Sequence, residues 1–200
     1  ADVACMSTVH EVTVAAELGC EAASLSCVTN RATGLSATPL THDEVTEVAD
    51  RVAQRLRALL AEFLRVTPEE IVITRNTSEA NNLVSNGIDL KAGDEVIVFS
   101  DNHPSNLQAW QEKAKRFGFA IRTVQQVNPH PGHDYYVKAI EREMSTRTRI
   151  LALTHMSSTV GVMLPVKELC RIGSERGILS LVTGAPAPGV MDVDLSDTPP

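Results

Sequence analysis

The feature that most constrains the fold is a regular alternation of short apolar runs with helix-like segments over the greater part of the chain. The runs are rich in β-branched residues, and the segments between them carry start and stop residues such as Pro104 and Gly118. Strand, helix and strand in succession favour right-handed crossovers, which make neighbouring strands parallel. We therefore predict an α/β fold with a mostly parallel sheet and helices on both faces. The predicted strands are Ile71–Thr74, Glu95–Phe99, Phe119–Val124, Ile150–Thr154 and Ile178–Val182.

The chain ahead of this alternation has a different character. Residues 1–43 are rich in Ala, Ser, Thr, Val and Cys and show no clean period, so we predict no role for them. From Asp43 to about Leu64, apolar residues recur every three or four positions, which predicts an amphipathic helix. We divide the chain into an N-terminal segment, residues 1–43, and one α/β domain, residues 44–200.

Composition favours small-molecule chemistry over binding to polyanions. The 25 acidic residues exceed the 18 basic ones, and no run of Lys or Arg suggests a nucleic-acid or membrane surface. No apolar stretch approaches the roughly 20 residues that cross a bilayer. The four cysteines lack metal-ligand spacing, so we expect no metal site. Asp2 and Glu11 stand where a signal peptide would be cationic, which predicts a cytoplasmic protein.

Polar residues follow the predicted strands at the end where parallel sheets bind ligands. Thr77 and Ser78 open a predicted helix, whose free N–H groups and dipole favour phosphate. The alternative is an ordinary N-cap formed by one of these hydroxyls, and from the residues alone this is the preferred interpretation. His103 precedes a helix-starting proline, where a capping or solvent-facing role is the ordinary one. Ser158 lies in a serine-rich loop that is equally typical of a simple turn.

A resemblance changes this weighting. Arg75–Val84, with the sequence Arg-Asn-Thr-Ser-Glu-Ala-Asn-Asn-Leu-Val, resembles the phosphate-binding segment of class V aminotransferase-like proteins. These proteins depend on pyridoxal phosphate and include cysteine desulfurases and isopenicillin N epimerase-like enzymes. The Pro-Ser-Asn after His103 is especially similar to the epimerase-like branch. The resemblance implies part of the large domain of a fold type I pyridoxal-phosphate-dependent transferase. It also implies that Thr77 and Ser78 hold the cofactor phosphate, that His103 lies on the pyridine ring, and that Ser158 contacts the cofactor.

The resemblance weakens after the last predicted strand. Thr183-Gly184-Ala185-Pro186 stands where the family has Asp-Gly-Ala followed by His or Gln. The family's Asp keeps the pyridine nitrogen protonated, so that the ring accepts electron density. Thr183 occupies this cofactor-binding position but is neutral. Pro186 has no polar side-chain group for the phenolic oxygen of the cofactor.

The family's Schiff-base lysine would follow about one strand and loop later, so we expect this chain to stop before it. We expect the lysines within the chain to be solvated charges and none to replace it; they are Lys91, Lys113, Lys115, Lys138 and Lys167. We therefore assign no catalytic residue.

Two functions are predicted. The first is a truncated or split pyridoxal-phosphate-dependent protein that acts on an amino acid by epimerisation, transamination or carbon–sulfur cleavage. By resemblance it would be a homodimer or would need a partner chain, and this chain alone would be inactive. The alternative is a non-catalytic remnant that binds a phosphate-bearing ligand or another protein. A nucleotide-binding domain would need a Gly-rich turn, which the sequence lacks.

Overall fold

The computed structural model describes residues 14, 17, 18 and 41–196, so most of segment 1–43 lies outside the described residues. The chain divides into two compact units, residues 1–61 and 62–200. The predicted amphipathic helix is present as α2 (His42–Leu64), which begins in the first unit and ends in the second. None of the described helices combines the length and hydropathy that a membrane span needs.

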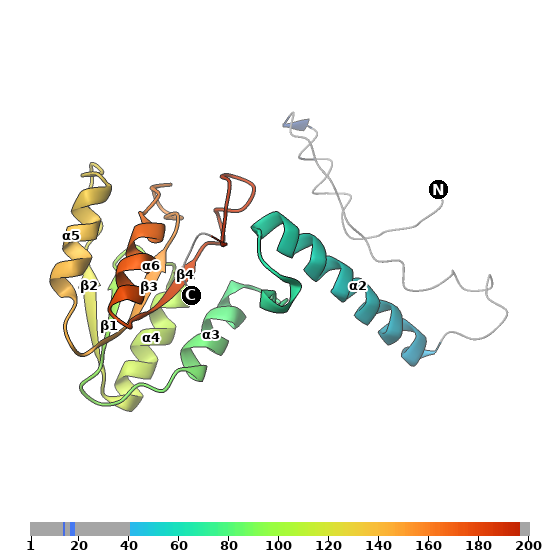
Figure 1. Cartoon of the computed structure of the whole chain (residues 1–200), viewed down its shortest axis with the longest axis horizontal. Helices are drawn as coiled ribbons and strands as arrows, with labels where there is room; N and C mark the ends of the chain where they lie inside the picture. The colour runs from blue at the N-terminus through green and yellow to red at the C-terminus, as the bar shows by residue number, and fades with distance from the viewer. Residues whose placement is uncertain (1–13, 15–16, 19–40, 197–200) are drawn as a thin grey trace. The chain divides into compact units, whose positions relative to one another are not determined.

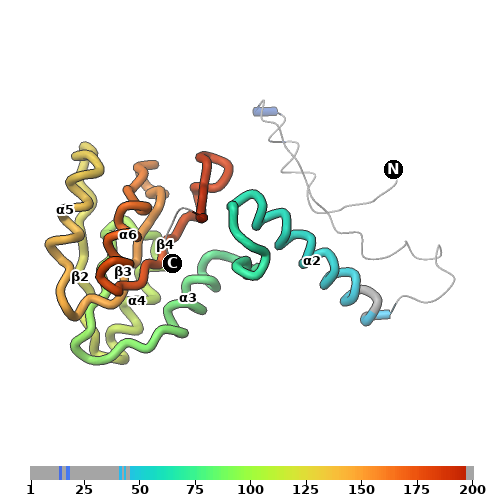
Figure 2. Tube along the Cα trace, viewed as in Figure 1, coloured from blue at the N-terminus to red at the C-terminus, as the bar shows by residue number. Residues whose placement is uncertain are grey.

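The second unit contains a four-stranded parallel sheet (Figure 1). Its strand order is β2-β1-β3-β4, and every neighbouring pair is parallel. Figure 2 shows the course of the chain through these strands and helices as a tube along the Cα atoms. In chain order the elements of this unit after α2 are η1 (Pro68–Glu70), α3 (Thr77–Gly87), β1 (Glu95–Phe99), α4 (Pro104–Phe117), β2 (Ala120–Val124), α5 (His133–Glu143), β3 (Thr148–Thr154), α6 (Val166–Glu175) and β4 (Leu179–Thr183).

Alternate residues of the two central strands bury themselves against helices on opposite faces of the sheet. On one face, side chains of β1 and β3 pack with α5 and α6, through Ile97, Leu151, Tyr136, Ile140 and Leu169. On the other face they pack with α4, through Val96, Val98, Ile150, Ala152 and Trp110. The predicted parallel sheet with helices on both faces is therefore confirmed.

One predicted strand does not form. Ile71–Thr74 is irregular chain that links η1 to α3, and Val72 and Ile73 are 74% and 43% exposed. A β-branched run becomes a strand only where another strand accepts its backbone hydrogen bonds, and no described strand pairs with this run. The other four predicted strands form, with bounds that differ from the predicted ones by at most two residues.

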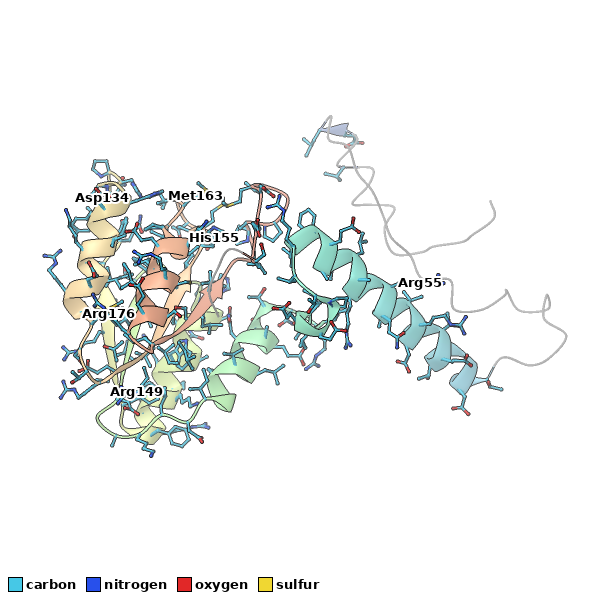
Figure 3. The ribbon with its side chains drawn as sticks, viewed as in Figure 1. Arg55, Asp134, Arg149, His155, Met163 and Arg176 are labelled. Atoms are coloured by element: carbon cyan, nitrogen blue, oxygen red, sulfur yellow. The ribbon has the colours of Figure 1, made fainter. Side chains whose placement is uncertain are left out.

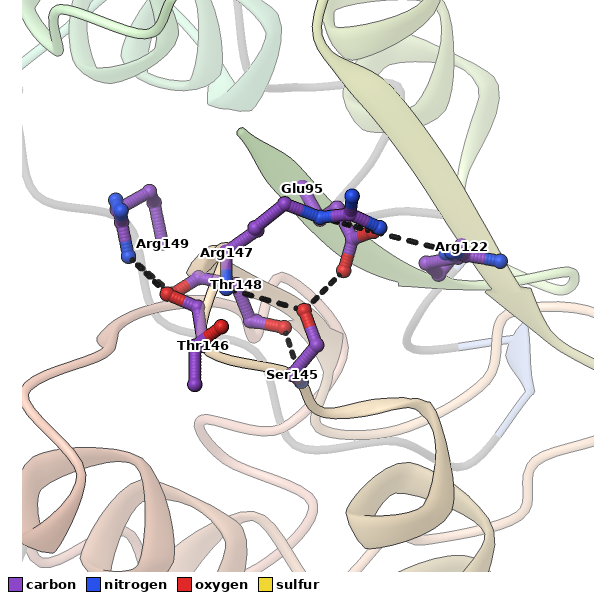
Figure 4. Close-up of polar contacts among 7 residues, drawn as sticks. All are labelled: Glu95, Arg122, Ser145, Thr146, Arg147, Thr148 and Arg149. Atoms are coloured by element: carbon purple, nitrogen blue, oxygen red, sulfur yellow. Dashed lines mark hydrogen bonds and ion pairs between the residues drawn. The ribbon is translucent and has the colours of Figure 1, made fainter. Parts of the chain in front are cut away.

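The amino end of the sheet is held by a buried carboxylate (Figure 4). Glu95 opens β1 and is 1% exposed. It accepts hydrogen bonds from the Ser145 hydroxyl at 2.6 Å, from Arg147 at 2.6 Å and from Arg122 at 3.0 Å. The bond from Ser145, together with those from the two arginines, lowers the pKa of Glu95 to about 2 although burial opposes the shift. Because Arg122 belongs to β2 and Arg147 precedes β3, this cluster joins three strands.

Candidate functional site

A cavity of about 270 Å³ lies at the carboxyl ends of β3 and β4. It is bounded by the last residues of both strands, the start of α3, the start of α4 and the loops after β3 and β4. The lining residues are Asn76, Thr77, Ser78, His103, Ser105, Thr154, Met156, Ser158, Thr183, Ala185 and Pro186. The structure therefore brings together all five residues predicted to bind a cofactor.

At one end of the cavity, α3 presents its N-terminus. The N-cap is Asn76, whose side-chain oxygen accepts from the Glu79 N–H at 2.9 Å. The ordinary-cap interpretation, which gave this role to Thr77 or Ser78, was therefore wrong about the capping residue. Within the described part of the chain, neither of these two hydroxyls has a hydrogen-bond partner. Both remain available to an anion at the helix N-terminus, where backbone N–H groups and the dipole also favour one.

The charge beside this N-terminus is balanced within the chain. Glu79 lies in the first turn of α3, where its carboxylate would compete with a bound anion. Arg75 pairs with it at 2.8 Å, and the Arg75 backbone N–H donates to it at 2.7 Å. The guanidinium bond first and the backbone bond second lower the pKa of Glu79. Glu79 therefore holds the turn before α3 and does not face the cavity as an unpaired charge.

His103 combines a capping role with a place in the cavity wall. It is the N-cap of α4, and its Nδ1 accepts from the Ser105 N–H at 3.2 Å and lies 2.8 Å from the Ser105 hydroxyl. Because Nδ1 accepts, the neutral imidazole carries its proton on Nε2. Its neighbour Asn102 is held by β3, since it donates to the Ala152 carbonyl at 2.9 Å and accepts from Thr154 at 2.5 Å. The imidazole is thus oriented from its own helix, and the residue before it is tied to the central sheet.

Ser158 reaches the cavity from the loop after β3. The preceding Ser157 shares a hydrogen bond with the carboxylate of Asp101, which follows β1. The Ser157 oxygen also accepts from the N–H groups of Thr159 and Val160, each at 3.2 Å. The loop is therefore a turn, as one interpretation predicted, and it is tied to the loop that precedes His103. Ser158 itself is exposed.

The part of the cavity wall at the end of β4 rests on a buried polar group, of which sequence reasoning identified Thr183 but missed the two asparagines. The Thr183 hydroxyl, 7% exposed, accepts from the Asn106 amide and donates to the Asn81 amide oxygen at 3.5 Å. Asn81 and Asn106 are 3% and 0% exposed. The Asn81 nitrogen and the Asn106 oxygen have no hydrogen-bond partner among the described residues. The sequence could have indicated Asn81 as part of the site, because it lies four residues after Thr77 and therefore on the same face of the helix.

One sequence expectation is corrected at the C-terminal end of α3. Lys113 is not a solvated charge: it is 7% exposed, and its ammonium donates to the carbonyls of Ser85 and Ile88 at the end of α3. Burial lowers the pKa of Lys113. His155 (labelled in Figure 3) does not line the site but borders a separate cavity of about 420 Å³ beside α6. Burial lowers the pKa of His155 as well.

Comparison with known proteins identifies the family. The chain matches the model of the family described as Aminotransferase class-V over residues 31–199. It belongs to this family. Isopenicillin N epimerase from Amycolatopsis lactamdurans is 34% identical over 146 residues, which are 72% of this chain and 37% of that protein. A probable cysteine desulfurase from Methanothermobacter thermautotrophicus is 36% identical over 147 residues, 74% of this chain and 36% of the relative.

A solved structure extends this class V likeness to three dimensions. A variant of C-DES with glycine covalently linked to its pyridoxal phosphate cofactor superposes with a TM-score of 0.71 at 27% identity, over 81% of this chain and 43% of that one. The predicted family and the predicted fold, part of a type I pyridoxal-phosphate-dependent architecture, are therefore confirmed. The cofactor expected for the family is present in this neighbour. The chain spans a little over a third of the length of the curated relatives it matches.

The residues of this class V chain fit pyridoxal phosphate at one end of the cavity and depart from it at the other. The Thr77 and Ser78 hydroxyls at the α3 N-terminus, which have no partner among the described residues, suit the phosphate. Toward β4, the described lining contains no carboxylate to pair with a pyridinium and no lysine to hold the cofactor covalently. Pro186 contributes no polar side chain there. The lining therefore fits the phosphate and the face of the ring, but it provides neither a counter-charge for a protonated ring nitrogen nor a covalent link.

Proposed function

We propose that this chain supplies the phosphate-binding and ring-facing side of a pyridoxal phosphate site in a protein that acts on an amino acid. The reaction would be an epimerisation, a transamination or a carbon–sulfur cleavage, as the family description and the names of the relatives and the solved neighbour suggest. One observation carries the proposal: the hydroxyls of Thr77 and Ser78 have no hydrogen-bond partner among the described residues, and both line the same cavity as His103 at a helix N-terminus.

The residues would divide the work of binding between them. Thr77, Ser78 and the first N–H groups of α3 would donate to the phosphate oxygens. His103 would offer the face of its imidazole to the ring, and the bond to Ser105 would keep that face in place. Ser158 would donate or accept at the edge of the ring. When bound, pyridoxal phosphate supplies an electron sink for negative charge on the substrate.

We further propose that this chain is inactive by itself. Without a lysine in the described lining, the site has no amine to form a Schiff base with the cofactor. The same observation, together with Thr183, favours the second candidate, a non-catalytic module that binds a phosphate-bearing ligand or another protein. By family resemblance we also propose a homodimer or a partner chain, and the exposed Val72 and Leu83 support it. Sedimentation of the chain at several concentrations tests this.

Binding of pyridoxine 5′-phosphate tests the main proposal, because this ligand has no aldehyde and needs no lysine. Isothermal titration is expected to show binding to the unaltered chain and a loss of at least about 100-fold in the double variant Thr77→Ala, Ser78→Ala. Each lost hydrogen bond to a charged group is worth about 1.5–3 kcal/mol. Thr146→Ala, which removes an exposed hydroxyl near the amino end of β3, is the matched control. Equal affinity in the double variant and the control would refute the proposed phosphate site.

Gene sequence separates the two candidate functions. A continuation or a neighbouring reading frame that encodes a Ser-Gly-His-Lys-like motif would supply the missing amine and support the enzyme. Its absence from both would support the non-catalytic module.

A further inference from the structure

We propose that Thr183 holds the ring nitrogen of a bound pyridoxal-phosphate-class ligand in its unprotonated form, as the outer end of a donor relay that begins at Asn106. This inference rests on the proposed function, since it concerns the ring end of the same cavity. It assigns Thr183 a positioning and selecting role that differs from that of the family's aspartate.

The hydrogen bonds of Thr183 set the direction of the relay. A hydroxyl has one proton to donate and two lone pairs to accept with. The Asn106 amide fills one lone pair from a fully buried position. The hydroxyl proton is directed at Asn81 over 3.5 Å, at the outer limit of a hydrogen bond, so it is weakly held. Thr183 lines the cavity, and an acceptor placed there would take this proton at little cost.

A ring nitrogen is such an acceptor only when it is unprotonated. A protonated ring would bring a positive charge to a wall where the described lining offers no carboxylate. Burial disfavours the charged form of a base that lacks a counter-charge. Thr183 is 7% exposed, so little water replaces that counter-charge. Both the direction of the relay and the missing charge therefore lower the pKa of a ring nitrogen bound here.

The unsatisfied amide groups beside Thr183 suggest a substitution that would make the site favour a protonated ring nitrogen instead. Asn81 and Asn106 both place amide groups against the Thr183 side chain, and no described residue provides an acceptor for the Asn81 nitrogen. A carboxylate has two oxygens, so it could accept from both amides and also present a negative charge to the ring. Thr183→Asp is therefore expected to fit, to satisfy the Asn81 nitrogen and to favour a protonated ring.

The test measures binding as a function of pH with two ligands. Pyridoxine 5′-phosphate is titrated into the 200-residue chain between pH 5.5 and 8, and benzyl phosphate, which lacks the ring nitrogen, is the matched ligand. The affinity for pyridoxine 5′-phosphate is divided by the affinity for benzyl phosphate, and this ratio cancels the effect of phosphate ionisation, which both ligands share. For the unaltered chain and for Thr183→Ser, this ratio is expected to rise about tenfold for each unit of increasing pH, up to the solution pKa of the ring nitrogen. The reason is that the protonated ligand must release one proton in order to bind. For Thr183→Asp the ratio is expected to stay level.

Nitrogen-15 NMR of ring-labelled pyridoxine 5′-phosphate, bound to the unaltered chain, reads the protonation state directly and needs no variant that might misfold. An unprotonated resonance at pH 6.5 supports the proposal. A protonated resonance, or a ratio that does not change with pH in the unaltered chain, overturns it and leaves the proposed phosphate site standing. If neither ligand binds, the proposed function itself fails.

Discussion

Replacement of Glu95 by glutamine removes one charge from the amino end of the sheet and keeps the shape of the side chain. The folded protein lowers the pKa of Glu95 from its usual value of 4.5 to about 2. At about 1.4 kcal/mol for each pKa unit, this difference sets an upper bound of about 3.5 kcal/mol on the stability that the charge contributes at pH 7. The side chains of Arg122 and Arg147 are 45% and 60% exposed, so water screens their ion pairs. We therefore expect Glu95→Gln to lower the free energy of unfolding by about 2 kcal/mol at pH 7.

The stabilising effect of the Glu95 charge should decrease as the pH falls. Because the pKa of Glu95 is lower in the folded state than in the unfolded state, its contribution is present above pH 4.5 and is lost as the pH falls toward 2. More than half is lost by about pH 3. The difference in unfolding free energy between the unaltered chain and Glu95→Gln should therefore shrink over this range.

Urea unfolding followed by tryptophan fluorescence measures this difference. Trp110 is the only tryptophan of the chain and is fully buried against the sheet, so its emission reports on that unit alone. Glu112→Gln is the control, because the pair between Glu112 and Lys115 is largely exposed and its loss should leave stability unchanged. A Glu95→Gln effect that is the same at pH 7 and pH 3.5, or no larger than that of the control, would refute the reasoning.

Three further variants test packing in the same urea assay. Lys113→Met is expected to cost about 1–3 kcal/mol, because two carbonyls at the end of α3 lose a charged donor, and an unchanged midpoint would contradict the assigned role. Gly173→Ala is expected to destabilise by about 1–2 kcal/mol, since its new methyl group would lie 3.2 Å from the Ile178 carbonyl oxygen. Gly87→Ala is expected to stabilise by about 0.5–1 kcal/mol, because a methyl group there would have no other atom within 4 Å. If both glycine-to-alanine variants stabilised the protein, or both destabilised it, this account would be contradicted.

The fold was largely predictable because its signals are local. The apolar runs of the central strands and the proline and glycine that bound α4 sit within a few residues of the structure they specify. Ile71–Thr74 shows the limit of such signals. Its β-branched residues carry the local preference for a strand, but a strand also needs a partner that the local sequence does not describe.

The site was predictable to the same extent and for a similar reason. Thr77, Ser78, His103, Ser158 and Thr183 each follow a strand or open a helix, and parallel strands bring such positions to one edge of the sheet. The capping residue was not predictable from the hydroxyls, because Asn76 competes for the same N–H groups one position earlier. The resemblance supplied the expected ligand class, which residue chemistry alone left open.

The sequence by itself determined the order of strands and helices, the family, and the replacement of the expected aspartate by Thr183. Only the tertiary structure decided which polar groups would be buried together. Asn81, Asn106 and Thr183 are far apart in the chain, as are Glu95 and Arg147, and their energies depend on how water is excluded when the elements pack. Burial and hydrogen-bond partners are properties of the packed unit, and they give Thr183 its surroundings and Glu95 its low pKa.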